Sequence, residues 1–145
     1  MSELTTCDVL VADDDEDCAH LLEVVLRQAG YSTRVARTGT EVMRLLQLVR
    51  PTLILMDWWM PELDGLECTR RIRSEPDLCG ISIIVVTAGC LRGDRERALA
   101  AGCDGYMTKP LSLERLLGEI RRCLAGGAVA APALADRKST RLNSS

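Results

Sequence analysis

Five short segments rich in apolar residues divide the first part of the chain, and each ends just before polar or charged positions. Short apolar runs of this kind are typical of strands that are buried on both faces of a sheet. The second segment is the most polar, so we place it at the edge of the sheet. The segments lie at residues 9–12, 31–36, 53–56, 81–86 and 105–107.

Helical periodicity follows each of these segments. Apolar residues recur on one side of residues 16–29, and Gly30 follows as a stop signal. A second helix begins after Thr38, which has capping-box spacing from Glu41, and its apolar pattern continues until Pro51. The remaining helices are predicted at residues 66–74, 94–101 and 112–124.

The order of the elements, a strand followed by a helix five times over, predicts an α/β fold with a parallel sheet. Crossover connections between parallel strands place helices on both faces of such a sheet. We expect a doubly wound, flavodoxin-like sheet of five strands in the order 2-1-3-4-5, in which the order reverses between the first and third strands. Ligands bind beside that reversal, outside the carboxyl ends of the strands.

Acidic, hydroxyl and ammonium side chains stand where the predicted strands end. Asp13 and Asp14 follow the first strand, Asp57 the third, Thr87 the fourth and Lys109 the fifth. Three carboxylates brought together repel one another and need a cation, and all-oxygen ligands suit Mg²⁺. An aspartate beside Mg²⁺ can attack phosphorus, because the metal and a lysine take up the charge of the phosphoryl group.

Four stretches of the chain together resemble the receiver domain of the response regulators of two-component signalling. They are Val-Leu-Val-Ala-Asp-Asp-Asp at residues 9–15, Asp-Trp-Trp-Met-Pro-Glu-Leu-Asp-Gly at 57–65, Thr-Ala at 87–88 and Ala-Gly-Cys-Asp-Gly-Tyr-Met-Thr-Lys-Pro at 101–110. The resemblance extends over about residues 7–124. It implies a cytoplasmic signalling module that is not a turnover enzyme: it would catalyse only its own phosphorylation and autodephosphorylation.

The resemblance also implies a phosphoacceptor and a metal site. Asp57 would take a phosphoryl group from a phosphohistidine on a histidine kinase or a histidine phosphotransfer protein. Mg²⁺ would be held by Asp13, Asp14 and Asp57 and by the backbone carbonyl of Trp59. Tandem tryptophans directly after the acceptor depart from the family pattern, and their bulk would shield the acyl phosphate from water or limit the access of a phosphatase.

Further residues gain roles from the same resemblance. Thr87 and Lys109 would bind the phosphoryl group, and Thr87 and Tyr106 would form a switch pair in which the hydroxyl moves toward the phosphate and the ring turns into the vacated space. A cis bond before Pro110 would aim the lysine. The face of the fourth helix, fifth strand and fifth helix would then dock a downstream output protein or a fused output domain.

Two other functions stay open from the residues alone. A haloacid-dehalogenase-type phosphatase would use Asp13 as nucleophile and Asp15 as acid and base, although Asp17 stands where that motif favours threonine or valine. If the chain is interpreted as a receiver domain, by contrast, Asp15 is a helix N-cap. A receiver-like domain that binds partners without phosphorylation is the other alternative.

The composition limits the classes of partner and metal that this domain is expected to bind. The formal net charge is −3, which argues against direct nucleic-acid binding by this domain because phosphate contacts need clustered Lys and Arg. No apolar run approaches the roughly 18 residues of a membrane helix, and the N-terminus does not resemble a secretory signal. The seven cysteines include no C-x-x-C pair, so neither a zinc site nor a disulfide framework is expected.

The C-terminal residues differ in composition from the rest. We expect a receiver domain over residues 1–125, followed at 126–135 by a linker or free tail rich in Gly, Ala and Pro. The last ten residues, Asp-Arg-Lys-Ser-Thr-Arg-Leu-Asn-Ser-Ser at 136–145, resemble the translation of a sequencing-library adapter. We therefore interpret them as a non-native, disordered tail and exclude them from the fold.

Overall fold

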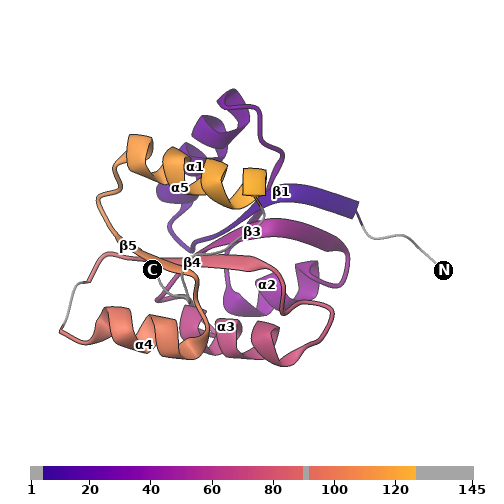
Figure 1. Ribbon diagram of the computed structural model, residues 1–145, viewed down its shortest axis with the longest axis vertical. Helices are drawn as coiled ribbons and strands as arrows, with labels where there is room; N and C mark the ends of the chain where they lie inside the picture. The colour runs from indigo at the N-terminus through magenta and orange to yellow at the C-terminus, as the bar shows by residue number, and fades with distance from the viewer. Residues whose placement is uncertain (1–4, 90–91, 127–145) are drawn as a thin grey trace. The chain divides into compact units, whose positions relative to one another are not determined.

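The computed structural model describes residues 5–89 and 92–126, and in this part of the chain a single parallel sheet has the order β2-β1-β3-β4-β5. This confirms the predicted α/β architecture and strand order (Figure 1). The second strand lies at an edge, as its polar sequence indicated. The strands are β1 (Thr5–Ala12), β2 (Thr33–Ala36), β3 (Val49–Asp57), β4 (Ser82–Thr87) and β5 (Gly105–Thr108).

A helix follows every strand. The helices are α1 (Glu16–Gln28), α2 (Gly39–Leu45), α3 (Gly65–Ser74), α4 (Asp94–Ala101) and α5 (Leu113–Gly126). The chain divides into two compact units, the first ending at Pro110 and the second beginning at Leu111, and α5 belongs to the second. The predicted linker and tail at 127–145 lie outside the described residues, while residue 126 ends α5. None of the helices described is both long and apolar enough to cross a membrane.

Both faces of the sheet are buried. Leu10 and Ile54 belong to a core cluster that also takes in residues of α2, α3 and α4. Their neighbours Val9 and Leu53 point to the opposite face, because successive side chains of a strand alternate, and they are buried as well. Figure 1 shows α1 on one side of the sheet and α2, α3 and α4 on the other. Continuous apolar runs thus form strands because no face of them meets water.

The boundary between α2 and β3 differs from the prediction. The helix ends at Leu45 instead of continuing to Pro51, and Val49 and Pro51 both belong to β3. A buried strand residue at position 49 happened to extend the helical spacing of the residues before it. Pro51 is tolerated in the strand because pairing with β4 begins only at Leu53, so β3 has a neighbour on one side there.

Side-chain caps fix the starts of α1 and α2, which follow β1 and β2. Asp15 accepts hydrogen bonds from amides of the first turn of α1, as predicted. Thr38 caps α2 by accepting from the amide of Glu41 at 3.0 Å. The Glu41 carboxylate accepts from the amide of Arg37 at 2.7 Å, one residue before the cap that a capping box would use. Two side-chain hydrogen bonds, one from each side of the turn, therefore stabilise the connection between β2 and α2.

Gly65, the first residue of α3, approaches the end of β3 too closely for a side chain. A methyl group there would lie 2.4 Å from the backbone oxygen of Asp57. We expect Gly65→Ala to reduce the free energy of unfolding by about 1–3 kcal/mol, because backbone atoms must move apart. Urea denaturation measures it. As a control, Gly118→Ala in α5, where a methyl group meets nothing within 4 Å, should stabilise by roughly 1 kcal/mol through helix propensity. Unchanged stability of Gly65→Ala would contradict the close approach.

Candidate functional site

Three carboxylates meet at the carboxyl edge of the sheet. Strands β1 and β3 are neighbours, and Ala12 pairs with Met56, so the residues that follow them, Asp13 and Asp57, leave the sheet side by side. Each of Asp13, Asp14 and Asp57 offers an oxygen, and these oxygens all lie within 4.8 Å of one another. Asp13 and Asp57 are buried, and Asp14 is exposed. The side chains that the sequence placed at adjacent strand ends therefore do converge.

Lys109 brings an ammonium group to this cluster. Its Nζ lies 3.0 Å from Oδ2 of Asp13 and 3.9 Å from Oδ1 of Asp57. Burial lowers the pKa of Lys109, but the hydrogen bond to Asp13 and the negative charges nearby outweigh it, so the pKa is raised overall. The lysine follows β5, its amide donates to the carbonyl of Thr87 at 2.8 Å, and its bond to Pro110 is cis.

The cluster holds more negative charge than the lysine balances. Burial, followed by the charge of Asp13, raises the pKa of Asp57 to about 7 although Lys109 opposes the shift. A nearby cation would stabilise the ionised form of this carboxyl group. The donor atoms are all carboxylate oxygens, the ligand class that Mg²⁺ prefers, and the exposed Asp14 leaves room for water. The residues present therefore fit a magnesium ion.

Two further predicted residues lie on the neighbouring strands β4 and β5. Thr87 ends β4 and is buried, and its Oγ1 accepts from the amide of Gly89 at 3.2 Å. Tyr106 is half-buried on β5, the strand that pairs with β4. The structure thus puts both members of the predicted switch pair on adjacent strands, where Tyr106 pairs with Val85 and Thr87 pairs with Thr108.

The two tryptophans have different surroundings, which the sequence interpretation did not distinguish. Trp58 is only 1% exposed, whereas Trp59 is 60% exposed. Trp58 belongs to the same core cluster as Ile54 and Met56, so it continues their alternation past the end of the strand. That period of two was the signal in the sequence that could have separated a core tryptophan from a surface one.

The side chain of Asp15 plays no part in the cluster. It is exposed, and its Oδ1 accepts from the amides of Asp17 at 3.0 Å and Cys18 at 3.3 Å. The phosphatase alternative needs Asp15 as an acid and base facing a substrate bound at Asp13. In the structure this side chain is engaged as the cap of α1 instead.

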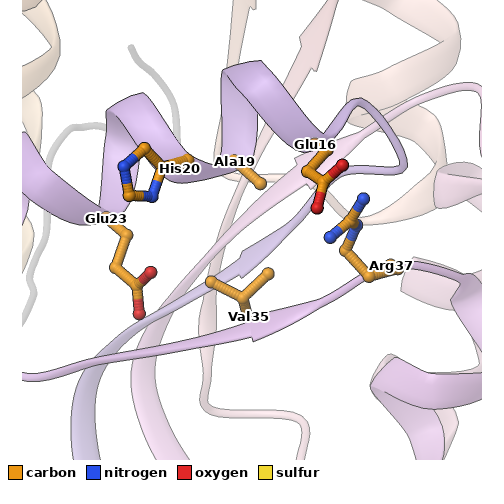
Figure 2. A pocket seen from close by; sticks show the side chains of 6 residues that line it. All are labelled: Glu16, Ala19, His20, Glu23, Val35 and Arg37. Atoms are coloured by element: carbon orange, nitrogen blue, oxygen red, sulfur yellow. The ribbon is translucent and has the colours of Figure 1, made fainter.

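A pocket of about 220 Å³ lies between α1 and β2 (Figure 2). Glu16 and Arg37 point into it from opposite walls. None of the three clustered aspartates lines the pocket, so it is separate from the candidate site. Its lining residues are Glu16, Ala19, His20, Glu23, Val35 and Arg37.

Comparison with known proteins places the chain among signalling domains. The family model for the response regulator receiver domain matches residues 9–121. The polar-differentiation response regulator DivK of Brucella anthropi is 37% identical over 116 residues, which cover 80% of this chain and 94% of that protein. DivK of Brucella ovis is 36% identical over 119 residues, which cover 82% of this chain and 97% of that protein.

Solved structures agree with the sequence relatives. A signal receiver domain of a signal transduction histidine kinase from Syntrophus aciditrophicus superposes with a TM-score of 0.78 at 36% identity, covering 83% of this chain and 91% of that one. The receiver domain of a sensor histidine kinase from Pseudomonas aeruginosa, solved with a magnesium ion coordinated in its active-site cleft, gives 0.75 at 31% identity, covering 86% and 100%. With its strand order, its convergent aspartates and these matches, the chain belongs to the response regulator receiver domains of two-component signalling.

Proposed function

We propose that this receiver domain is the phosphoacceptor module of a phosphorelay and that Asp57 is the acceptor. The observation that carries the proposal is the cluster of Asp13, Asp14 and Asp57, whose carboxylate oxygens lie within 4.8 Å of one another. Lys109 donates a hydrogen bond to Asp13 in this cluster. Asp57 is the member that ends the central strand β3, and Lys109 lies within 4 Å of both buried carboxylates. The donor is a histidine kinase or a histidine phosphotransfer protein.

Asp13, Asp14 and Asp57 would hold Mg²⁺, together with the backbone carbonyl of Trp59. The metal, when bound, neutralises charge on the carboxylates and on the incoming phosphoryl oxygens. The magnesium ion in the related Pseudomonas receiver domain supports this assignment. Asp13 is fixed in place because its Oδ1 accepts from the amide of Asp15 at 2.9 Å while its Oδ2 accepts from Lys109.

The transfer step follows from the geometry of the acceptor. A carboxylate oxygen of Asp57 attacks the phosphorus, and the phosphorus–nitrogen bond of the donor breaks with its electron pair returning to the imidazole. Lys109 stabilises the charge that develops on the phosphoryl oxygens. The product is an acyl phosphate, which adds about −1.5 to −2 of charge where Asp57 stood.

Thr87 and Tyr106 would respond to this added charge. The Thr87 hydroxyl now accepts from Gly89, and on phosphorylation it would turn to donate to a phosphoryl oxygen. Tyr106 on the adjacent strand would then move into the space that the hydroxyl leaves. A docking face that includes α4 and β5 changes in consequence and controls a downstream output protein or a fused output domain. The exposed indole of Trp59 would shield the acyl phosphate from water.

Acetyl phosphate tests the proposal without the cognate kinase. With Mg²⁺ the wild-type protein should gain the mass of one phosphoryl group, and excess EDTA should prevent the gain. Asp15→Asn should be phosphorylated like the wild type, because Asp15 lies outside the cluster. Multiple-turnover hydrolysis of small phosphoesters that is lost in Asp15→Asn would support the phosphatase instead. A folded wild-type protein that gains no mass would support a receiver-like module that works without phosphorylation.

A further inference from the structure

The buried ring of Trp58 connects the acceptor strand to two other elements. Its centroid lies 5.7 Å from that of Trp59, with which it stacks, and 6.4 Å from that of Tyr106 on β5, which it meets edge-on at 81°. Its amide donates to the carbonyl of Val86 at 3.0 Å, and its carbonyl accepts from the amide of Gly65 at 2.7 Å. Trp58 therefore has a backbone fixed between β4 and α3 and a ring that reaches other parts of the fold.

Arg97 of α4 covers this ring. Its guanidinium carbon lies 5.2 Å from the centroid of Trp58, within the range of a cation–π interaction. The same guanidinium lies 3.6 Å from a carboxylate oxygen of Asp94, one turn earlier on the helix. The side chain of Arg97 is largely exposed, whereas the ring of Trp58 is buried. We call this contact between the guanidinium and the ring the clasp. Tryptophan presents the strongest aromatic face for such a contact.

The two ends of α4 are held differently. At its N-terminus the helix begins after Gly93, which has a left-handed backbone and provides no side-chain cap. At its C-terminus the carbonyl of Gly102 accepts from Nε of Arg73 at 2.8 Å, and Asp104 pairs with the same guanidinium at 2.8 Å. Arg73 comes from α3, so the end of α4 is tied to a neighbouring helix. The clasp at Arg97 lies between these ends, toward the half of α4 without a side-chain cap.

We propose that Arg97 is a positioning residue, which couples α4 to the acceptor residue through the ring of Trp58. Trp58 is the next residue after Asp57, so a displacement of the acceptor backbone moves the surface on which the guanidinium rests. The fixed attachment through Arg73 makes the C-terminal end of α4 the pivot, and the clasp then controls the position of the N-terminal half. The coupling to phosphorylation rests on the proposed function, but the clasp itself does not.

Amide hydrogen exchange of α4 tests the clasp in the metal-free, unphosphorylated protein. Arg97→Met keeps a long apolar side chain and removes the charge, and it should speed exchange of the α4 amides about two- to fivefold. Arg97→Lys keeps a cation and should restore most of the protection. Arg95→Met, an equivalent change at an exposed position of the same helix, should leave the exchange rates unchanged.

A double-mutant cycle separates the clasp from a general effect on the helix. In a Trp58→Leu background, Arg97→Met should give no further acceleration, because the ring that it acts on is gone. Equal acceleration with and without Trp58, or wild-type exchange in Arg97→Met, would overturn the proposal. Should Trp58→Leu not fold, the contrast among methionine and lysine at 97 and methionine at 95 still decides the matter, and equal rates in all three would reject the clasp.

Phosphorylation tests the coupling separately. After treatment with acetyl phosphate and Mg²⁺, Arg97→Met should gain the same mass as the wild type, while the change in α4 exchange on phosphorylation falls at least twofold. An undiminished change would show that α4 responds by another route and would reject the coupling. If the wild type gains no phosphoryl group, the proposed function fails, but the metal-free exchange data still show whether the clasp exists.

Discussion

The Asp57→Asn variant should take up no phosphoryl group from acetyl phosphate under conditions in which the wild type becomes fully phosphorylated. An amide is a poor nucleophile, and the variant lacks the carboxylate oxygen that would form the acyl phosphate. The loss should therefore be complete within detection by intact-protein mass spectrometry. The fold should survive, because an asparagine side chain has nearly the same volume and relieves repulsion among the clustered carboxylates.

Asp15→Asn is the matched control for this experiment, since it makes the same chemical change two residues beyond Asp13 at a position that caps α1. Full uptake by Asp15→Asn and none by Asp57→Asn would locate the acceptor. Uptake by Asp57→Asn that peptide mapping assigns to Asp13 or Asp14 would mean that the cluster is correct but the acceptor is wrong. Loss of uptake in both variants would indicate a fold defect and would be visible in the far-ultraviolet circular dichroism.

The same substitution should stabilise the metal-free protein, by an amount that depends on pH. Burial and the charge of Asp13 raise the pKa of Asp57 from 3.8 to about 7. The folded state then holds a proton that the unfolded state releases, so wild-type stability falls as pH rises from about 4 to about 7. Asparagine carries no such penalty. Three pKa units correspond to about 4 kcal/mol, which is the upper value for the advantage of Asp57→Asn at pH 8.

Urea denaturation at pH 4, 6 and 8 in EDTA measures this advantage. The gap between variant and wild type should be largest at pH 8 and small at pH 4, where the aspartate is protonated in the folded state and about half protonated in the unfolded state. Saturating Mg²⁺ should shrink the gap at pH 8, because the ion stabilises the wild-type carboxylate and binds the variant less well. A gap that is independent of pH, or wild-type stability equal to that of the variant at pH 8, would mean that Lys109 already balances the cluster.

Much of this fold could be predicted from the sequence because the sheet is parallel and covered on both faces. Strands buried on two sides read as continuous apolar runs, as in Leu53-Ile-Leu-Met56, and the polar residue that ends each run marks the edge of the sheet. Since the carboxyl ends of all five strands share that edge, the convergence of Asp13, Asp57 and Lys109 followed from topology alone. The distances among them did not.

The structural features that could not be predicted from the sequence depend on contacts between segments far apart in the chain. The end of α2 was placed too late because Val49 fits a helical spacing, and only its pairing with β1 makes it a strand residue. The contact of Arg97 with Trp58 depends on the packing of α4, which no local pattern encodes. The division between the domain at 1–125 and the segments at 126–135 and 136–145 stays a prediction, as does the role of each site residue.

The alternation of side chains at the end of β3 has a consequence for how such a domain can vary. Asp57 and Trp58 occupy consecutive backbone positions, but the side chain of Asp57 joins the acidic cluster, whereas that of Trp58 joins the hydrophobic core shared with α2, α3 and α4. Under the proposed function, a substitution that packs against Trp58 would therefore alter the phosphorylation of Asp57 as well as the stability of the fold, although it lies outside the acidic cluster.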